Sequence, residues 1–194
     1  AVSMNTFKKQ KPGSVGTALE GYEVKIVDEE LSEVDRGAIG DIIVKGDNVM
    51  QGYLNRPTAT EETIINGWLL TGDVGYMDDE GFIFIVDRKK DLIISKGINI
   101  YPREIEEVID AFQGVAASAV IGLMDEKNGE VPVAYIELEE EVDALDEAGL
   151  KKYLKEHLAN YKIPKQIHVI PALPKNATGK VLKRVLKENL REEG

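Results

Sequence analysis

The chain has 194 residues, 43% of them hydrophobic and 30% charged, which is the composition of a folded globular protein. It contains no cysteine, which excludes a disulfide framework, a thiol nucleophile and a thiolate zinc site, and no apolar run approaches the ~20 residues of a membrane-spanning helix. Because His157 and His168 are the only histidines, any catalysis has to use Lys, Arg, Asp or Glu, and we expect no metal site in this chain.

The charge is distributed unevenly along the chain. A net charge of −11 argues against nucleic acid as a partner. Residues 150–194 contain 11 of the 24 Lys and Arg and 4 of the 35 Asp and Glu, which leaves 13 and 31 for residues 1–149. The sequence begins Ala1-Val2-Ser3-Met4, without an initiator methionine or a signal-peptide pattern. We therefore expect a cytoplasmic protein that has been processed or is a fragment.

Residues 21–84 are typical of short, half-buried strands. Their apolar residues alternate with polar ones in bursts that are bounded by turn residues. Three such bursts are the runs 23–27, 41–45 and 82–86. Glu80-Gly81 predicts the turn before the last of them, and one short helix is expected over 60–65, after Pro57. The first part of the chain is therefore predicted to be a small β barrel or sheet.

After Asp87 the pattern changes to alternating helices and strands. Pro102 can open a helix with a single apolar stripe, which consists of Ile105, Val108, Ile109 and Phe112. Further strands are expected over 116–123, 132–138 and 166–170, and further helices over 146–160 and 181–190. We predict an α+β fold in which a β-rich subdomain, 1–87, is joined by a hinge to a small α+β domain, 88–194.

Three polar clusters are candidates for a functional site. In Thr71-Gly72-Asp73 the carboxylate could cap its own turn or accept hydrogen bonds from the two hydroxyls of a ribose. The run Asp87-Arg88-Lys89-Lys90-Asp91 taken alone is typical of a solvated linker. In Pro174 to Lys180 a glycine-bearing loop presents Lys180, which could stabilise a phosphate or carboxylate oxygen as charge develops, or could simply precede a basic helix. The spacing is not that of a P-loop.

The three clusters in combination resemble a known family. Gly40-Asp41-Ile42, Thr71-Gly72-Asp73, Asp87 to Asp91 with Lys96-Gly97, and Pro174 to Lys180 occur in the order of the later core motifs of the adenylate-forming superfamily. That superfamily includes acyl-CoA synthetases, adenylation domains of peptide synthetases and beetle luciferases. The resemblance covers the chain from Gly13 onward. It implies a two-step ligase, in which ATP and a carboxylic acid form an acyl-adenylate and a thiol, commonly coenzyme A, then takes the acyl group and releases AMP.

The resemblance also implies roles for individual residues in the first step. Asp73 and Arg88 match the residues that hydrogen-bond the ribose hydroxyls, and Ile85 matches a position that packs near the nucleotide. Lys180 matches the lysine that bridges the reacting carboxylate and the α-phosphate, where its charge would offset the negative charge that gathers as two anions approach.

The remaining implied roles belong to the second step. Lys90 matches the hinge about which the small C-terminal domain swings between the two half-reactions. Lys96 and Gly97 would then lie at the channel of coenzyme A, where a glycine lets the pantetheine arm pass close to the backbone. The basic C-terminal segment could favour the coenzyme A phosphates or could be a solvated lysine-rich helix.

Several motifs of the family are absent from this sequence. These are its Gly/Ser/Thr-rich phosphate loop, the motif before its acyl pocket and the Tyr-Gly-x-Thr-Glu motif with a magnesium-binding Glu. We therefore expect the C-terminal portion of a longer enzyme, inactive alone, whose own N-terminal domain is its partner and holds the Mg²⁺ ligands. The expected substrates are a carboxylic acid, ATP and coenzyme A.

The choice of substrates rests on two segments, Gly40 to Pro57 and Asp87 to Ile94. Both look more like fatty-acyl ligases than amino-acid adenylation domains, so we predict a fatty-acid–CoA ligase of the long-chain type. The nearer alternative is an adenylation enzyme that uses a carrier protein. A second alternative, from another class, is a non-enzymatic interaction module with an acidic sheet and a basic tail.

Overall fold

The computed structural model describes residues 1–192, with side chains up to residue 189. The chain divides into two compact units, Ala1–Lys90 and Asp91–Gly194, which we call unit 1 and unit 2 and describe separately. Within the described residues, no helix is both long and apolar enough to cross a membrane. The mixed α+β class predicted from the sequence is confirmed.

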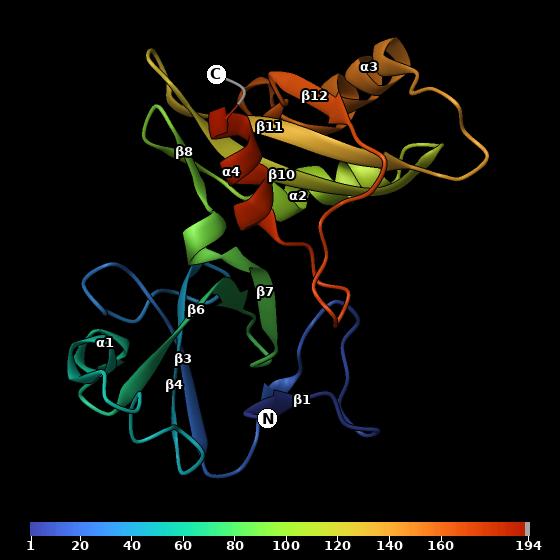
Figure 1. The fold of residues 1–194 in the computed structure, drawn as a ribbon. Coiled ribbons are helices and arrows are strands. Elements are labelled where there is room, and N and C mark those ends of the chain that lie inside the picture. Colours follow the sequence, from blue (N-terminus) through green and yellow to red (C-terminus); the bar gives the residue numbers. More distant parts are fainter. Residues whose placement is uncertain (193–194) are drawn as a thin grey trace. The chain divides into compact units, whose positions relative to one another are not determined.

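Unit 1 is built on an antiparallel sheet. The neighbours in this sheet are β3 (Tyr22–Val27), β4 (Gly40–Gly46), β6 (Trp68–Met77) and β5 (Ile64–Ile65), and β7 (Ile83–Arg88) pairs with the C-terminal half of β6 (Figure 1). A second, two-stranded sheet pairs β1 (Ser3–Met4) with β2 (Thr17–Ala18). The buried side chains of Ile26, Ile42, Val44, Met77 and Ile83 form one core cluster in this unit. The three predicted strands are all present, because each alternates apolar and polar residues.

The helix of unit 1 begins earlier than predicted. The sequence prediction was 60–65, whereas α1 spans Pro57–Thr63 and Pro57 is its first helical residue. Proline suits this position, because the missing N–H would have no intrahelical partner there. The β-branched residues that follow, Ile64 and Ile65, pair as β5 with Leu69 and Trp68, so they leave the helix for the sheet.

A segment near the N-terminus covers part of the outer edge of β7. The N–H of Val15 donates to the carbonyl oxygen of Ile83 over 2.8 Å, and the N–H of Ile83 donates to the carbonyl oxygen of Gly16 over 2.9 Å. Gly16 has a φ of 90°, and a Cβ there would lie 1.9 Å from the backbone carbon of Met4. Only glycine fits at this crossing of two backbones.

Unit 2 is organised around the long hairpin of β10 (Val115–Asp125) and β11 (Gly129–Leu138). β12 (Gln166–Val169) adds to β11 in parallel, and a small hairpin of β8 (Ile93–Ser95) and β9 (Ile98–Ile100) joins β11 where Gly129 pairs with Ser95. The strands predicted over 116–123, 132–138 and 166–170 are confirmed, and the first two extend further into the turn between them. The hairpin of β8 and β9 was not predicted.

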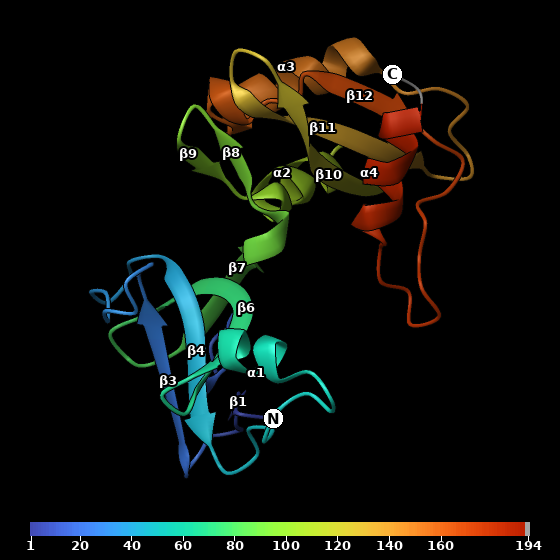
Figure 2. The ribbon, with the colours of Figure 1, turned by 60° about the vertical axis from the view of Figure 1, so that its left-hand side comes forward.

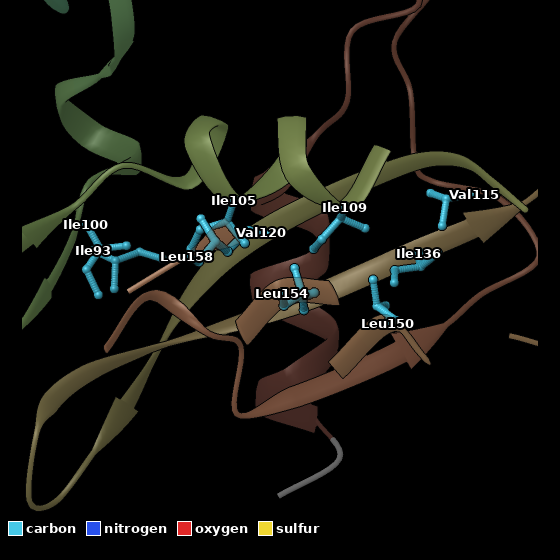
Figure 3. Packing of buried hydrophobic residues seen from close by; sticks show 11 residues of the cluster. Ile93, Ile100, Ile105, Ile109, Val115, Val120, Ile136, Leu150, Leu154 and Leu158 are labelled. Atoms are coloured by element: carbon cyan, nitrogen blue, oxygen red, sulfur yellow. The ribbon is translucent and has the colours of Figure 1, made fainter. Parts of the chain in front are cut away.

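Helices cover both faces of the sheet of unit 2. On one face lie α2 (Pro102–Asp110) and α3 (Glu147–His157), and on the other lies α4 (Lys183–Glu192) (Figures 1 and 2). Neighbouring residues of one strand serve opposite faces, so that Val120 packs with α2 and α3 while Ile121 packs with Leu186 of α4. The larger cluster includes Ile105, Ile109, Ile136, Leu150 and Leu154, all fully buried (Figure 3).

The helix ends of unit 2 follow local sequence signals. Pro102 is the first residue of α2, as predicted, and Glu104 adds a negative charge in the first turn. The carboxylate of Asp146 caps α3 by accepting from the N–H of Gly149 over 2.9 Å, also as predicted. α3 ends at His157, before the predicted end near 160, and a 3-10 turn, Asn160–Lys162, follows. α4 starts at Lys183 rather than Val181, because Val181 forms a β-bridge with Lys175.

Candidate functional site

In unit 1 the Thr71-Gly72-Asp73 cluster lies on a bulge inside a strand rather than on the turn that its sequence suggested. β6 pairs with β4 on both sides of it, but the register shifts between Asp41 and Ile43. The hydroxyl of Thr71 donates to the carbonyl oxygen of Ile42 over 2.7 Å and accepts from the N–H of Asp73 over 3.1 Å. Gly72, with a φ of 74°, supplies the left-handed residue that the bulge needs. The bulge fixes the direction in which Asp73 projects.

Asp73 and Arg88 face each other across β6 and β7. They are register partners, and Nε of Arg88 lies 2.7 Å from Oδ1 of Asp73. The side chains are 45% (Arg88) and 23% (Asp73) exposed, so both can be reached from solvent. A carboxylate accepts up to four hydrogen bonds and a guanidinium offers five donors, so each group has unused capacity for a ligand. Adjacent acceptors and donors of this kind suit a pair of hydroxyls.

The predicted position near the nucleotide, Ile85, lies on the same pair of strands. Its register partner is Gly75, and its half-buried side chain packs against the core cluster of unit 1. A Cβ on Gly75 would lie 2.1 Å from the carbonyl oxygen of Phe84 and 2.9 Å from Cδ1 of Ile42, so the two strands approach closely only because this residue is glycine. Ile85 therefore lies where β6 and β7 approach closely, on the same pair of strands as Asp73 and Arg88.

The charged run 87–91 is more ordered than a solvated linker. Asp87 is 8% exposed and its Oδ1 accepts from the N–H of Arg88 over 2.7 Å. Lys89 forms an ion pair with Asp41 of β4. Lys90 is exposed in the middle of the 3-10 turn Lys89–Asp91, at the point where the contacts divide the chain into its two units. A solvated linker thus describes Lys90, whereas Asp87 is buried and the exposed Arg88 and Lys89 form ion pairs within unit 1.

In unit 2, Lys180 lies on an exposed turn whose two strands are pinned together. Lys175 and Val181 form a β-bridge, and the N–H of Leu182 donates to the carbonyl oxygen of Pro174 over 2.7 Å. Residues 175–180 are all exposed. Lys180 is therefore exposed to solvent on a turn that hydrogen bonds close, and its role toward an anion stays a prediction.

The stem of this hairpin is attached to the sheet by a carboxylate. Glu137 of β11 accepts from the N–H of Leu173 over 2.9 Å and lies 3.1 Å from Nζ of Lys175. These two partners hold the pKa of the Glu137 carboxyl below its usual range, the backbone N–H being the larger cause. The carboxylate therefore stays charged to a lower pH than an ordinary glutamate does, and in that form it binds both partners in the stem.

Lys96 and Gly97 form the turn of the hairpin of β8 and β9. Their φ angles are 50° and 77°, the positive pair that a two-residue hairpin with type I′ geometry requires. The N–H of Lys96 donates to the carbonyl oxygen of Asn128 over 2.7 Å, which ties this turn to the one between β10 and β11. No heavy atom lies within 4 Å of where a Cβ on Gly97 would be. The space beside this glycine is open, as a passing ligand would need.

The seven predicted residues lie at four places in the fold, one of which is the 3-10 turn with Lys90. Asp73, Ile85 and Arg88 lie together on β6 and β7 of unit 1. In unit 2 the turn of β8 and β9, with Lys96 and Gly97, and the hairpin that carries Lys180 lie on different sides of the sheet (Figure 2). Within the described residues, no three His, Asp or Glu side chains are grouped so that they could hold a metal ion.

Two models of one protein family match the chain. The model of the AMP-binding enzyme matches residues 1–54, and that of the AMP-binding enzyme C-terminal domain matches residues 104–180. The chain belongs to the AMP-binding, adenylate-forming enzymes. The resemblance inferred from the order of the motifs is confirmed.

Relatives within the adenylate-forming enzymes include two bacterial ligases. The chain is 49% identical over 178 residues to the 2-succinylbenzoate–CoA ligase of Listeria monocytogenes serotype 4b (strain F2365), and 46% identical over 182 residues to that of Bacillus subtilis (strain 168). The alignments cover 92% and 94% of this chain but 35% and 37% of the relatives. The chain therefore spans just over a third of their length.

Solved structures of the same family have the same fold. The ATP-bound MatB of Rhodopseudomonas palustris matches with a TM-score of 0.91 at 40% identity, over 96% of this chain and 38% of that protein. The o-succinylbenzoate CoA synthetase of Bacillus subtilis, in complex with its acyl-adenylate intermediate, matches with a TM-score of 0.82 at 46% identity, over 91% and 36%.

Proposed function

We propose that this chain is the C-terminal part of an ATP-dependent acid–CoA ligase, which activates a carboxylic acid as acyl-adenylate and transfers it to coenzyme A. The observation that carries the proposal is the 49% identity to a 2-succinylbenzoate–CoA ligase over 92% of the chain. The share of the relatives that is covered, 35%, and the match to a C-terminal domain model support a longer protein with an N-terminal domain as partner. On this proposal the chain alone has no measurable turnover.

In the adenylation step, unit 1 would bind the sugar of the nucleotide. The Asp73 carboxylate would accept from the ribose hydroxyls and the Arg88 guanidinium would donate to them, while Ile85 packs near the nucleotide. The 2.7 Å contact between Asp73 and Arg88 holds both groups in place before the ligand arrives, so little side-chain freedom is lost on binding. The bulge in β6 sets the direction of the Asp73 side chain in this arrangement.

Lys180 would supply the positive charge for the same step. Two anions, the carboxylate of the acid and the α-phosphate, have to approach each other, and an ammonium between them offsets the charge that gathers there. The exposed hairpin of unit 2 gives the lysine the reach for this role. We assign no step to magnesium here and propose, from the family resemblance, that its protein ligands lie in the N-terminal part.

In the second step unit 2, Asp91–Gly194, would turn about Lys90 and present another face. Lys90 is exposed in a 3-10 turn between two units that each have a core of their own, which suits a hinge of few residues. The turn at Lys96 and Gly97 would then border the pantetheine channel, with open space beside Gly97. A single rotation would therefore both withdraw Lys180 and bring the turn at Lys96 and Gly97 to the channel.

The identity of the acid substrate is the part of the sequence prediction that has to change. A fatty acid, in particular a long-chain one, finds no support among the relatives, eight of which are 2-succinylbenzoate–CoA ligases at 44% to 49% identity. We therefore propose 2-succinylbenzoate as the acid to test first. The same names favour coenzyme A over a carrier protein as acceptor, and an enzyme over an interaction module. A cytoplasmic location stays a prediction.

The test uses the complete enzyme that contains this chain. With 2-succinylbenzoate, ATP and Mg²⁺, we expect AMP release that depends on coenzyme A. Asp73→Ala should raise the KM for ATP by about tenfold or more, since a hydrogen bond to a charged group contributes roughly 1.5–3 kcal/mol. Exposed Asp79→Ala on the neighbouring turn is the matched control and should leave the KM unchanged. An unchanged KM for ATP in the Asp73→Ala enzyme would show that Asp73 is not part of the nucleotide site. AMP release that does not depend on coenzyme A would contradict the proposal that coenzyme A is the acyl acceptor.

A further inference from the structure

The turn that carries Lys180 is held by a single side chain, Asn176. Its Oδ1 accepts from the N–H of Thr178 over 3.0 Å, from the hydroxyl of Thr178 over 2.8 Å and from the N–H of Lys180 over 2.9 Å. The backbone N–H of Asn176 donates in return to the carbonyl oxygen of Lys180 over 2.9 Å. Both backbone polar groups of Lys180 are therefore bonded to one residue.

One further backbone hydrogen bond closes the turn, from the N–H of Gly179 to the carbonyl oxygen of Asn176 over 2.9 Å. Apart from these backbone bonds and the Asn176 side chain, little fixes the turn. Residues 175–180 are exposed, so no buried apolar side chain fixes them. Gly179 has a φ of 82° and no heavy atom within 4 Å of where its Cβ would be, so the backbone passes through a left-handed residue in open space. Without Asn176 the tip would have many accessible conformations, each placing the Cα of Lys180 differently.

Ion pairs attach both ends of the hairpin to the rest of unit 2. Upstream, Glu137 of β11 holds Lys175. Downstream, Nζ of Lys183 lies 2.7 Å from Oε1 of Glu106 on α2, and both side chains are only 17% exposed. The same Glu106 oxygen accepts from the N–H of Val120 over 2.7 Å. The stem is thus fixed to β11 and α2, and through Glu106 to β10. The hydrogen bonds of Asn176 fix the tip of the hairpin in turn.

We propose that Asn176 is a positioning residue for Lys180, and that it makes the hairpin a rigid arm which moves with unit 2 as one piece. The inference rests on the proposed role of Lys180 in adenylation. A lysine side chain has several rotatable bonds, so fixing its Cα is the part of its placement that the fold can supply in advance. Asn176 acts through Lys180 and does not itself touch the substrate.

Asn176 should therefore matter for one half-reaction only. In Asn176→Ala we expect the rate of adenylate formation to fall by about 10- to 100-fold, because a displacement of about 1 Å in a reacting group can cost a factor of about 100. The KM for ATP should stay within about twofold, since the ribose site lies on unit 1. Thioester formation from supplied acyl-adenylate should not change, because Lys180 has no role in it.

The experiment uses the complete enzyme with 2-succinylbenzoate and ATP as probes. Adenylate formation is followed by single-turnover release of pyrophosphate, and thioester formation by adding synthetic succinylbenzoyl-adenylate and coenzyme A. Asn176→Asp keeps an oxygen acceptor at the same position and should retain most of the activity. Asn189→Ala, at an exposed residue of α4, is the matched control and should behave as the parent enzyme. Melting curves of all variants show whether each is folded.

A double-mutant cycle completes the test. Because Asn176 acts through Lys180, Asn176→Ala should have no further effect in a Lys180→Ala enzyme. The positioning role is overturned if Asn176→Ala slows both half-reactions equally, or if its effect adds fully to that of Lys180→Ala. If Lys180→Ala itself leaves adenylation unchanged, the proposed role of Lys180 fails. If only Lys180→Ala is defective, the role of Lys180 stands and the inference about Asn176 fails.

Discussion

Truncation of Leu154 tests the core that holds unit 2 together. Leu154 is fully buried on α3, in one cluster with Ile109 of α2 and Ile136 of β11 (Figure 3). Leu154→Ala removes the buried atoms and leaves a cavity, because surrounding side chains relax only in part, and substitutions of this kind cost roughly 3–4 kcal/mol. Domains are stable by about 5–15 kcal/mol, so the variant should lose roughly a fifth or more of the free energy of unfolding.

The assay is urea denaturation of the 194-residue chain, followed by far-UV circular dichroism. For a unit of about 100 residues, the melting temperature should also fall by at least ~12 °C. Leu54→Ala removes the same atoms from a side chain that is 88% exposed, and this control should change the free energy of unfolding by less than about 0.5 kcal/mol. A loss below about 1 kcal/mol for Leu154→Ala, or equal losses for both variants, would refute the reasoning.

Three further predictions concern single contacts. Gly75→Ala should destabilise unit 1 by about 1–3 kcal/mol or more, since a Cβ would lie 2.1 Å from the carbonyl oxygen of Phe84. Unfolding is followed by the fluorescence of the one tryptophan, and an unchanged midpoint of unfolding would contradict the close approach. Glu137→Gln should lower stability near pH 7, and the difference from the parent should shrink as the pH falls through the depressed pKa of Glu137; a difference that grows on acidification would contradict its lowered pKa. Gly97→Ala, at a φ of 77°, should cost about 1–2 kcal/mol and raise the KM for coenzyme A while leaving adenylation intact; an unchanged KM would remove Gly97 from the channel.

The elements that were predicted well are those with a strong local pattern. α2 has a proline at its start and an apolar stripe with helical spacing, and these signals need no knowledge of distant residues. β6 was missed because Gly72 and Asp73 in its middle are typical turn residues, and the partners that make the segment a strand, on β4 and β7, are distant in the sequence. The three-residue strands β8 and β9 are too short to give a pattern.

The residues of the candidate site also divide into those that the sequence could predict and those that it could not. The order of the motifs was enough to identify the family and to propose Lys180 as the reactive lysine. It could not reveal Asn176, because a side chain that accepts from backbone N–H groups leaves no periodic signal, although Asn is common in turns where its side chain bonds the backbone two residues on. Nor could it show that Asp87 is buried, since the residue stands in a run of charges that is typical of solvent.

The hydrogen bonds between the N-terminal segment and Ile83 have a consequence for solubility. An open strand edge is a template on which a second chain can pair, and β7 would offer such an edge where Val15 and Gly16 now occupy it. Deletion of the first 16 residues would remove this protection, together with β1, while the five strands of the larger sheet remain in the chain. A shortened form that starts at residue 17 should therefore self-associate through β7. A charge or a proline introduced at that edge should prevent this association.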